Sequence, residues 1–329
     1  MTRSITMRSL ALLVFATLIW ARPGGAQRSD RDRRRAEAEE NDRDNDDGAG
    51  IDTTVPFASS GGVVDLSIVS GQITVTGWTR SEARIHASSD NDVPVRFEHG
   101  PDRILIDARH GRRWRDGGDV QLDISVPVGT RVIMHSTDGE LHAHGTKGDI
   151  DARSVSGDVI VDDVVRSATL ESVSGNVQAR GVAGDVRARS VSGDVDLDQV
   201  SGDVTLSSVS GHGFVTSSKS RAVRMETVSG DLSYAGAFDA AGTYDFRSHS
   251  ANIELHLPTD AGALLSIDTF SGDVQTDFPL TIQPRSDEAR GPEHHHIETT
   301  LGHGGAHVTV STFSGDVEIR RGNSRTHAE

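Results

Sequence analysis

Residues 184–211 read GDVRARSVSGDVDLDQVSGDVTLSSVSG, which is one nine-residue pattern written three times. The pattern is Gly-Asp-Val, a variable residue, Ala or Leu, two variable residues, and then Val-Ser. The spacing extends back to residue 139, with glycine at positions 139, 148, 157, 175, 184, 193, 202 and 211 and Arg166 in the one vacant slot. A fixed short period of this kind predicts stacked units, none of which can fold alone.

Apolar residues alternate within each copy. Val195 and Leu197 flank one polar residue, and a period of two indicates a strand. The next valine has the opposite parity, so the chain must turn a corner before it. A Ser-Gly-Asp step supplies the second corner, because glycine tolerates positive φ and Asp or Ser can bond neighbouring backbone groups. We expect each copy to bury about three apolar side chains, including these third-position valines: Val155, Val164, Val173, Val182, Val191, Val200 and Val209.

Side-chain volumes suggest that two copies make one turn. At the second apolar position Ala152 is followed by Val161, Leu170 by Ala179, and Ala188 by Leu197. Small residues would then face large ones across two packed sheets. The sequence thus predicts an all-β solenoid with 18-residue turns, about six or seven of them over residues 138–257. An antiparallel meander stays open, since a period does not fix strand direction.

The N-terminal residues predict export. Arg3 and Arg8 precede an apolar run over residues 10–21, and small residues follow before Gln27. This order is typical of a secretory signal peptide, residues 1–26, cleaved between Ala26 and Gln27. An uncleaved anchor is the alternative, although the run is short for a membrane span. Residues 27–50 are almost wholly charged, small or amide-bearing and predict a disordered linker.

Composition excludes several classes of protein. The 329 residues include no cysteine, which rules out a disulfide framework and a thiol nucleophile. A net charge of −16 argues against nucleic-acid binding, which needs a basic face. We expect a periplasmic, cell-surface or extracellular protein with no stable membrane span after cleavage. Residues 51–329 predict a single domain with irregular N-terminal strands (51–137), regular repeats (138–257) and C-terminal strands (258–321) around a histidine-containing loop (283–297).

Three stretches resemble one known family: GGVVDLSIVSGQITVTGWTRSEARIHA at 61–87, VPVGTRVIMHSTDGELHAHGTKGDIDARSVSGDV at 126–159, and LLSIDTFSGDVQTDFPL with HVTVSTFSGDVEIR at 264–280 and 307–320. They are similar to a bacterial domain-of-unknown-function family of proposed adhesins with a toast-rack-like β-solenoid fold. The resemblance covers residues from about 55 to 321. It implies an exported or membrane-tethered envelope protein, sometimes encoded near envelope-stress or anti-sigma systems. It implies no catalytic residue.

The acids that follow the repeat glycines do not form a calcium-binding motif. Calcium-binding nonapeptides carry paired glycines before the acid, whereas each unit here has one glycine and one acid. With two copies per turn, one edge reads Asp149, Ser167, Asp185, Asp203 and the other reads Asp158, Asn176, Asp194, His212. A neutral residue interrupts each series, which favours a turn-capping role over a metal role.

Two polar clusters have the composition of ligand sites. Imidazole is a common metal ligand, and the histidines that could supply one are His294, His295, His296, His303 and His307. Their spacing favours a solvated loop, so no metal site is predicted. Guanidinium groups beside an aromatic plane suit a sugar acid or phosphate. The candidate ligand loop has this make-up and consists of Arg112, Arg113, Trp114 and Arg115. Its alternative is an exposed loop without a ligand.

The sequence does not support an enzymatic function. A solenoid lyase or hydrolase needs convergent carboxylates in one groove, but the acids here recur evenly, and no nucleophile or phosphate-loop motif occurs. We therefore predict a non-catalytic, cofactor-free envelope protein, an adhesin or scaffold that presents a rigid repeating surface to an envelope protein or surface polymer. The alternative is an accessory or sensor protein in envelope-stress signalling that binds a partner protein. A carbohydrate-acting solenoid enzyme is a third, weaker hypothesis.

Overall fold

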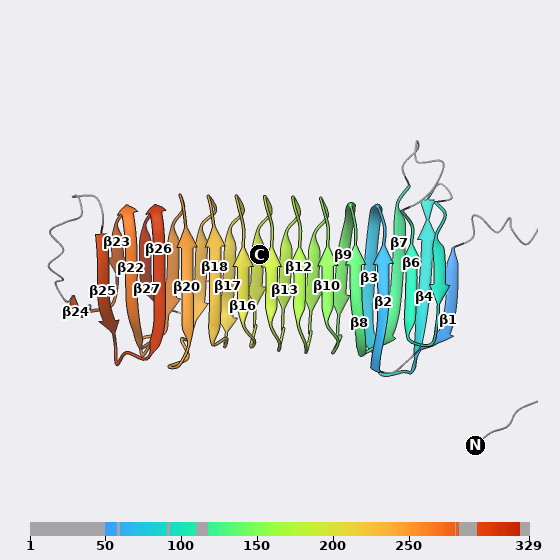
Figure 1. Cartoon of the computed structure of the whole chain (residues 1–329), viewed down its shortest axis with the longest axis horizontal. Helices are drawn as coiled ribbons and strands as arrows, with labels where there is room; N and C mark the ends of the chain where they lie inside the picture. Colours follow the sequence, from blue (N-terminus) through green and yellow to red (C-terminus); the bar gives the residue numbers. More distant parts are fainter. Residues whose placement is uncertain are drawn as a thin grey trace, which may run out of the picture. The chain divides into compact units, whose positions relative to one another are not determined.

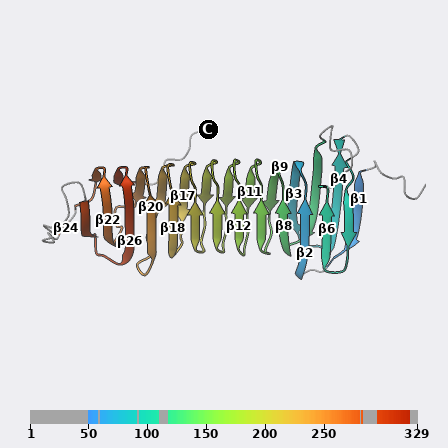
Figure 2. The same ribbon diagram turned by 45° about the horizontal axis from the view of Figure 1, so that its top comes forward.

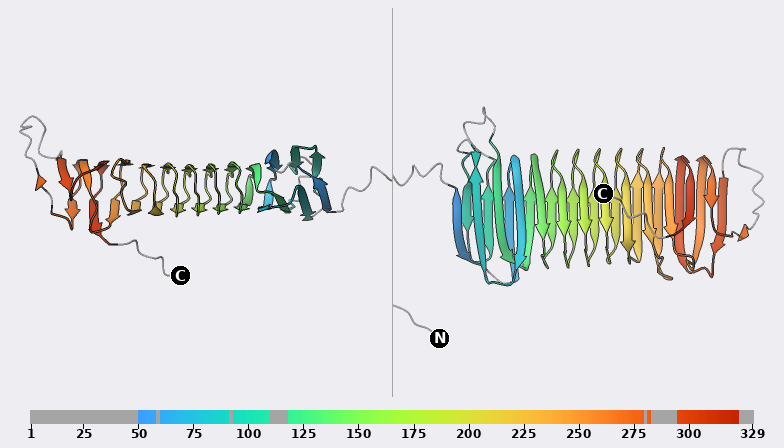
Figure 3. Two further views of the ribbon diagram at one scale, coloured as in Figure 1. Left: turned by 90° about the horizontal axis from the view of Figure 1, so that it is seen from below. Right: turned by 180° about the vertical axis from the view of Figure 1, so that it is seen from behind.

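Two long sheets stack face to face in the computed structural model, which describes residues 50–57, 60–90, 93–109, 118–279, 281–282 and 295–322. Sheet A has 13 strands and sheet B has 14. Successive turns of the chain run along the stack, as Figure 1 shows, and the edge-on view in Figure 3 separates the two layers. The predicted signal peptide and residues 27–49 of the linker lie outside the described residues.

The regular part consists of β8 (Gly129–His135), β9 (Asp138–His144), β10 (Ile150–Arg153), β11 (Val159–Asp162), β12 (Ala168–Glu171), β13 (Val177–Arg180), β14 (Val186–Arg189), β15 (Val195–Asp198), β16 (Val204–Ser207), β17 (Gly213–Ser218), β18 (Ala222–Thr227), β19 (Leu232–Gly236), β20 (Thr243–Ser248) and β21 (Ile253–Leu257). Odd-numbered strands lie in sheet A and even-numbered strands in sheet B. Each pairs in parallel with the strand one turn on, so that Val177 is opposite Val195. The predicted β-solenoid with two repeats per turn is confirmed, and its strands are parallel.

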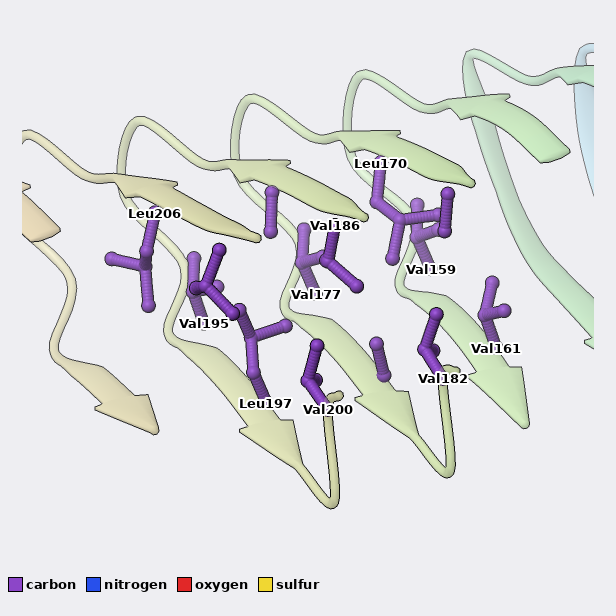
Figure 4. Packing of buried hydrophobic residues seen from close by; sticks show 14 of the residues in the cluster. Val159, Val161, Leu170, Val177, Val182, Val186, Val195, Leu197, Val200 and Leu206 are labelled. Atoms are coloured by element: carbon purple, nitrogen blue, oxygen red, sulfur yellow. The ribbon is translucent and has the colours of Figure 1, made fainter. Parts of the chain in front are cut away.

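The core fills the space between the two sheets. Val195 and Leu197 of sheet A and Leu206 of sheet B are each 0% exposed. Figure 4 shows these side chains pointing from both sheets into the space between them. Burial of each such side chain stabilises the fold by roughly 1.5–3 kcal/mol. The alternation read from the sequence therefore identifies the inward face of every regular strand.

The two corners of a turn differ. We call residues 154–157 and their equivalents 172–175, 190–193 and 208–211 the serine corner, and residues 163–166, 181–184 and 199–202 the valine corner. At the valine corner Val164, Val182 and Val200 are buried, as predicted. At the serine corner the corresponding valines are Val155, Val173, Val191 and Val209, and they are 39–46% exposed. The expectation that every copy buries a third apolar side chain is wrong for these four copies.

Hydrogen bonding explains the difference. At the serine corner Ser190 occupies the inward position, where its hydroxyl accepts from Gly193 N at 3.0 Å and donates to Gly175 O at 3.1 Å. The following valine must then point outward. At the valine corner the preceding residue takes a left-handed conformation, with φ of 67° at Gly181 and 55° at Gln199. That reversal of the backbone turns the following valine inward.

The repeat glycines have a different role from the one predicted. Positive φ does not occur at Gly157, Gly175 or Gly193. Instead, a β-carbon placed on Gly193 would lie 2.1 Å from the carbonyl oxygen of Gly175, one turn earlier. Glycine suits the serine corner because consecutive turns approach closely there, and the equivalent position after Ser248 is occupied by a residue with only a methyl side chain, Ala251.

The N-terminal end closes the stack with β1 (Ile51–Pro56), β2 (Ser60–Ser67), β3 (Ser70–Trp78), β4 (Glu82–Ser89), β5 (Arg96–His99), β6 (Arg103–Asp107) and β7 (Val120–Pro127). Strands β2 and β3 form a turn that pairs in parallel with β8 and β9, so the solenoid begins here, where the Ser-Gly step at residue 70 already follows the repeat pattern. Strands β6 and β7 stack outside that turn. Antiparallel β4 and β1 extend sheet A beyond β7, and antiparallel β5 extends sheet B beyond β6.

The C-terminal end contains β22 (Ala263–Ser271), β23 (Val274–Thr276), β24 (Thr281–Ile282), β25 (His295–Leu301), β26 (Ala306–Ser314) and β27 (Val317–Arg321). The turn formed by β26 and β27 lies between the β20–β21 turn and the β22–β23 turn, although it follows both in sequence. Figure 2 shows β26 beside β22 and β20. The hexapeptide TFSGDV thus occurs on neighbouring turns, with Thr269 opposite Thr312 and Val274 opposite Val317.

Candidate binding surface at the serine corner

A row of exposed side chains follows the serine corner along the stack. It contains Val155, Val173, Val191, Val209, Val228, His249, Phe313 and Phe270, in their spatial order. We call these eight residues the apolar row. Its valines are 39–46% exposed, and Phe313 and Phe270 are 50% and 40% exposed. Successive members come from successive turns, so they are about 4.8 Å apart.

The backbone holds the apolar row in place. Val173 O accepts a hydrogen bond from Ser192 N at 2.9 Å, and Val191 O accepts from Ser210 N at 2.9 Å. The same bond continues along the row as far as His249, whose backbone O accepts from Ser314 N. Because the sheet hydrogen-bonding continues through the corner, each exposed side chain has a fixed height along the stack.

Aromatic rings extend the row at its C-terminal end. The rings of His249 and Phe313 are 5.1 Å apart and nearly parallel, and those of Phe313 and Phe270 are 4.9 Å apart with 2° between their planes. His249 directly follows β20, Phe313 lies near the end of β26 and Phe270 near the end of β22. The insertion of β26 between the other two strands brings the rings together. The out-of-order turn therefore completes the apolar row.

A serine row and a capped carboxylate row lie on the sheet A side. Ser174, Ser192 and Ser210 are exposed next to the valines. Beyond them, Asp194 Oδ1 accepts from His212 N at 2.8 Å, and Asn176 Oδ1 accepts from Asp194 N at 2.9 Å. The same bond to the next turn repeats from Asp158 to Asp273. These side chains cap the turn above, as a turn-capping role requires, but their partner is one turn away rather than a sequence neighbour.

Alternating charges line the sheet B side of the apolar row. One register position of the sheet B strands, just before the serine corner, holds in order His135, Arg153, Glu171, Arg189, Ser207, Glu226, Arg247, Ser311 and Asp268. We call this series the charged margin. Arg153 contacts Glu171 at 3.7 Å and Arg247 contacts Glu226 at 3.8 Å. Arg189 forms no ion pair with any residue that the structure describes.

The side chains and charges of this surface follow the regular spacing of the stack. Its side chains are aliphatic, aromatic or hydroxyl-bearing, and its charges are spaced evenly along the stack. Within the described ranges, no group of three His, Asp or Glu side chains is arranged to hold a metal ion. The described part of the chain also contains no helix long and apolar enough to span a bilayer.

Comparison with known proteins agrees with this architecture. The family model Toastrack DUF4097 matches residues 115–320, more than half of the chain. The chain belongs to the Toastrack DUF4097 family. This membership confirms the family resemblance predicted from the sequence, and none of the curated proteins compared with the chain matches it.

Two solved structures are similar to this Toastrack chain. One is a putative adhesin from Bacteroides fragilis NCTC 9343, with 12% sequence identity, a TM-score of 0.40, and coverage of 83% of this chain and 97% of that chain. The other is a putative cell adhesion protein from Clostridium sporogenes ATCC 15579, with 9% identity, a TM-score of 0.21, and coverage of 83% and 100%.

None of the sequence-predicted ligand candidates belongs to the apolar row of the Toastrack stack, and several lie outside the described residues. Arg112, Arg113, Trp114 and Arg115 are outside the described residues, as is His294. His296 on β25 bonds Asp268 at 2.6 Å and approaches Glu298 at 3.4 Å. The hydrogen bond to Asp268 raises the pKa of His296 above its ordinary value of 6.5. His303 and His307 are exposed.

A shallow depression on the outer face of sheet B is the other feature of this Toastrack surface. Its lining includes Thr169, Arg187, Thr205, Arg224 and Asp245. Arg224 is bonded to Glu226 and Asp245, so its charge is already neutralised. Carboxylates and guanidinium groups therefore alternate here as they do elsewhere on the sheet. Sequence reasoning missed the apolar row, although the serine that precedes each of its valines in the regular turns distinguishes these copies from the others.

Proposed function

We propose that this protein is a non-catalytic, exported protein of the cell envelope, in which the apolar row is the adhesive edge of a rigid scaffold. The apolar row is the single observation that carries the proposal. Seven large apolar residues and one histidine form a continuous exposed strip. Continuous exposed apolar strips mark interaction sites, whereas isolated exposed valines need no explanation.

Rigidity supports a scaffold role. Eight positions at the strand spacing extend over roughly 34 Å, and the backbone bonds at every corner fix their heights. A binding partner therefore meets a preformed surface, and little conformational entropy is lost on the side of this chain. The even spacing of the charges supports a non-catalytic role, because catalysis requires convergent groups.

Export can be tested on the full chain expressed in a bacterial host with its own N-terminal segment. Cell fractions are probed for the chain, and the mature N-terminus is read by mass spectrometry. We expect an envelope or extracellular chain that begins at Gln27. A cytoplasmic chain that begins at residue 1 or 2 would contradict the export proposal.

Adhesion can be tested with beads that carry the purified chain and are mixed with cells of the native host. The triple variant Val173→Asp, Val191→Asp and Val209→Asp places charges along the apolar row. We expect it to abolish bead attachment while the melting temperature changes little. The matched control is Val165→Asp at the valine corner, where the side chain is 50% exposed and lies off the row. Equal attachment by the triple variant and the wild type would contradict an adhesive role for the row.

A further inference from the structure

We infer that the apolar row binds a second copy of this chain, antiparallel and related by a two-fold axis at Val209. The inference rests on the proposed adhesive role of the row and names its partner. The axis runs perpendicular to the sheets, so that the charged margins of the two copies lie side by side. Three independent features favour a second copy over other partners, namely the spacing of the row, the order of the charges, and the distribution of large and small side chains.

The spacing of the apolar row favours one kind of partner. Members of the row are about 4.8 Å apart, because each comes from a new strand. A helix repeats about every 5.4 Å, and over seven intervals the mismatch grows to roughly 4 Å, nearly a whole step. An extended strand presents one face about every 6.6–6.8 Å, which is worse. A second β-solenoid has the same spacing and can place one side chain opposite each member along the whole row.

The charged margin is complementary to itself. A two-fold axis at Ser207, which is on the same turn as Val209, places Arg189 of one copy opposite Glu226 of the other. One step further out, Glu171 meets Arg247. These contacts occur twice in a symmetric pair, so four pairs of opposite charge form around the centre. Moving the axis half a step in either direction brings like charges together, Arg189 with Arg247 or Glu171 with Glu226.

At the outer steps of the charged margin, no like charges meet. Arg153 meets the neutral Ser311, and His135 meets Asp268. Arg189 is well suited to the contact, since it is exposed and has no ion pair within the described part of its own chain. The order of charges thus sets both the antiparallel direction and the register.

Side-chain size agrees with this register. The same axis places Phe313 opposite Val155 and Phe270 opposite Thr137, which precedes Val155 by one turn at the serine corner. The bulky end of one row therefore faces the small end of the other. Val191 meets Val228, and Val209 meets itself.

The carboxylates on the sheet A side set the tilt of the pair. Asp194 would face Asp231 across the axis, which is unfavourable. The exposed serine row separates these acids from the valines, and each acid caps the turn beyond it. The two copies are therefore closer together on the sheet B side, where the charged margins attract each other, and farther apart on the sheet A side.

The absence of cysteine from the sequence makes cross-linking a direct test. We use the full chain with its own N-terminal segment, purified after expression. Val209→Cys lies on the axis and should form a disulfide dimer under mild oxidation. Val191→Cys should not cross-link to itself but should do so when mixed with Val228→Cys. Val165→Cys at the valine corner is the control and should stay monomeric. Self-linking of Val191→Cys at the rate of Val209→Cys would overturn the proposed register.

Solution size gives the second test. Sedimentation should show a dimer for the wild type and a monomer for Val209→Asp at the same concentration, with equal melting temperatures. Arg189→Glu should weaken dimerisation by about tenfold, and adding Glu226→Arg in the same chain should restore it. A wild type that stays monomeric at 0.1 mM, with Val209→Cys linking no faster than Val165→Cys, would overturn the dimer. Bead attachment to cells by such a monomer would leave the adhesive role intact and assign it another partner.

Discussion

The serine corner and the valine corner come from one nine-residue pattern, yet they place the same valine on opposite sides of the sheet. Val173 is 44% exposed and Val182, nine residues later, is buried. The residue before the valine makes the difference. Ser172 is held inward by Gly175 N and Gly157 O, whereas Gly181 turns the backbone through positive φ. A repeat can therefore keep its spacing and its composition while one position decides which side chains reach solvent.

The largest expected effect comes from one charge placed at each corner in turn. Val182→Asp puts an unpaired carboxylate into the core and should reduce the free energy of unfolding by roughly 4 kcal/mol or more. Val173→Asp keeps its charge in water and should change it by no more than about 0.5 kcal/mol. Chemical denaturation of both variants measures the contrast. Similar losses in the two variants would show that the corners are not different.

Glycine substitutions should next separate close backbone contact, at Gly193 of the serine corner, from left-handed backbone conformation, at Gly181 of the valine corner. Gly193→Ala forces a β-carbon against the carbonyl oxygen of Gly175, with an expected cost of about 1–3 kcal/mol. Gly181→Asn should cost less than about 1 kcal/mol, because Asn tolerates a left-handed conformation and the nearest atom is a side-chain oxygen of Asp163. Thermal melting of the two variants shows which substitution lowers stability more. A larger loss for Gly181→Asn would mean that conformation, not contact, limits both glycines.

The buried hydroxyl can be tested alone. Ser190→Ala leaves Gly193 N without its acceptor, which should cost about 1–3 kcal/mol. Ser190→Thr is the control, because threonine occupies the equivalent position in β18, β22 and β26 and its hydroxyl at Thr227 bonds Gly230 N. We expect Thr to retain most of the stability in urea denaturation. If alanine proved as stable as serine, the hydroxyl would not be what orients the corner.

The smallest expected effect concerns the interaction between Asp268 on β22 and His296 on β25, at the C-terminal end of the stack. Asp268 raises the pKa of His296, so this bond contributes stability that is complete below the ordinary pKa of the histidine and is lost as pH rises through the raised value. Asp268→Asn should therefore lower the melting temperature more at pH 5.5 than at pH 8.5. Asp260→Asn, an exposed change nearby in sequence, is the control. A pH-independent difference would show that the bond does not titrate with His296.

Much of the fold was predictable because the regular turns obey one period. The alternation at Val195 and Leu197 identified the inward face, and the volumes of Ala188 and Leu197 indicated two copies per turn. The two corners were predictable in principle, since the residue before the valine alternates between Ser190 and residues such as Gly181 or Gln199. Aligning the sequence with a period of nine residues hides that alternation, whereas aligning it with a period of 18 residues shows it.

The ends and the candidate surface were less predictable for a physical reason. The repeated hexapeptides at Thr269 and Thr312 show that two turns are alike, but sequence separation does not show that they are neighbours. Pairing between them depends on a turn that returns into the stack after a long connection. The stacked rings of Phe270 and Phe313 depend on that pairing, so the aromatic end of the apolar row could not be derived from the period.

The position of β26 and β27 sets the order in which the molecule can be assembled. From β10–β11 to β20–β21, each turn can be added onto the one made before it as the chain emerges, N-terminus first. The β22–β23 turn cannot take its final neighbour until residues 306–321 arrive and enter the gap beside β20 and β21. Until those residues have been made, the open edge of β20 and β21 is available to the β22–β23 turn, which carries the same TFSGDV segment as β26 and β27. Completion of the stack therefore waits for residues 306–321, which must enter between two turns made before them.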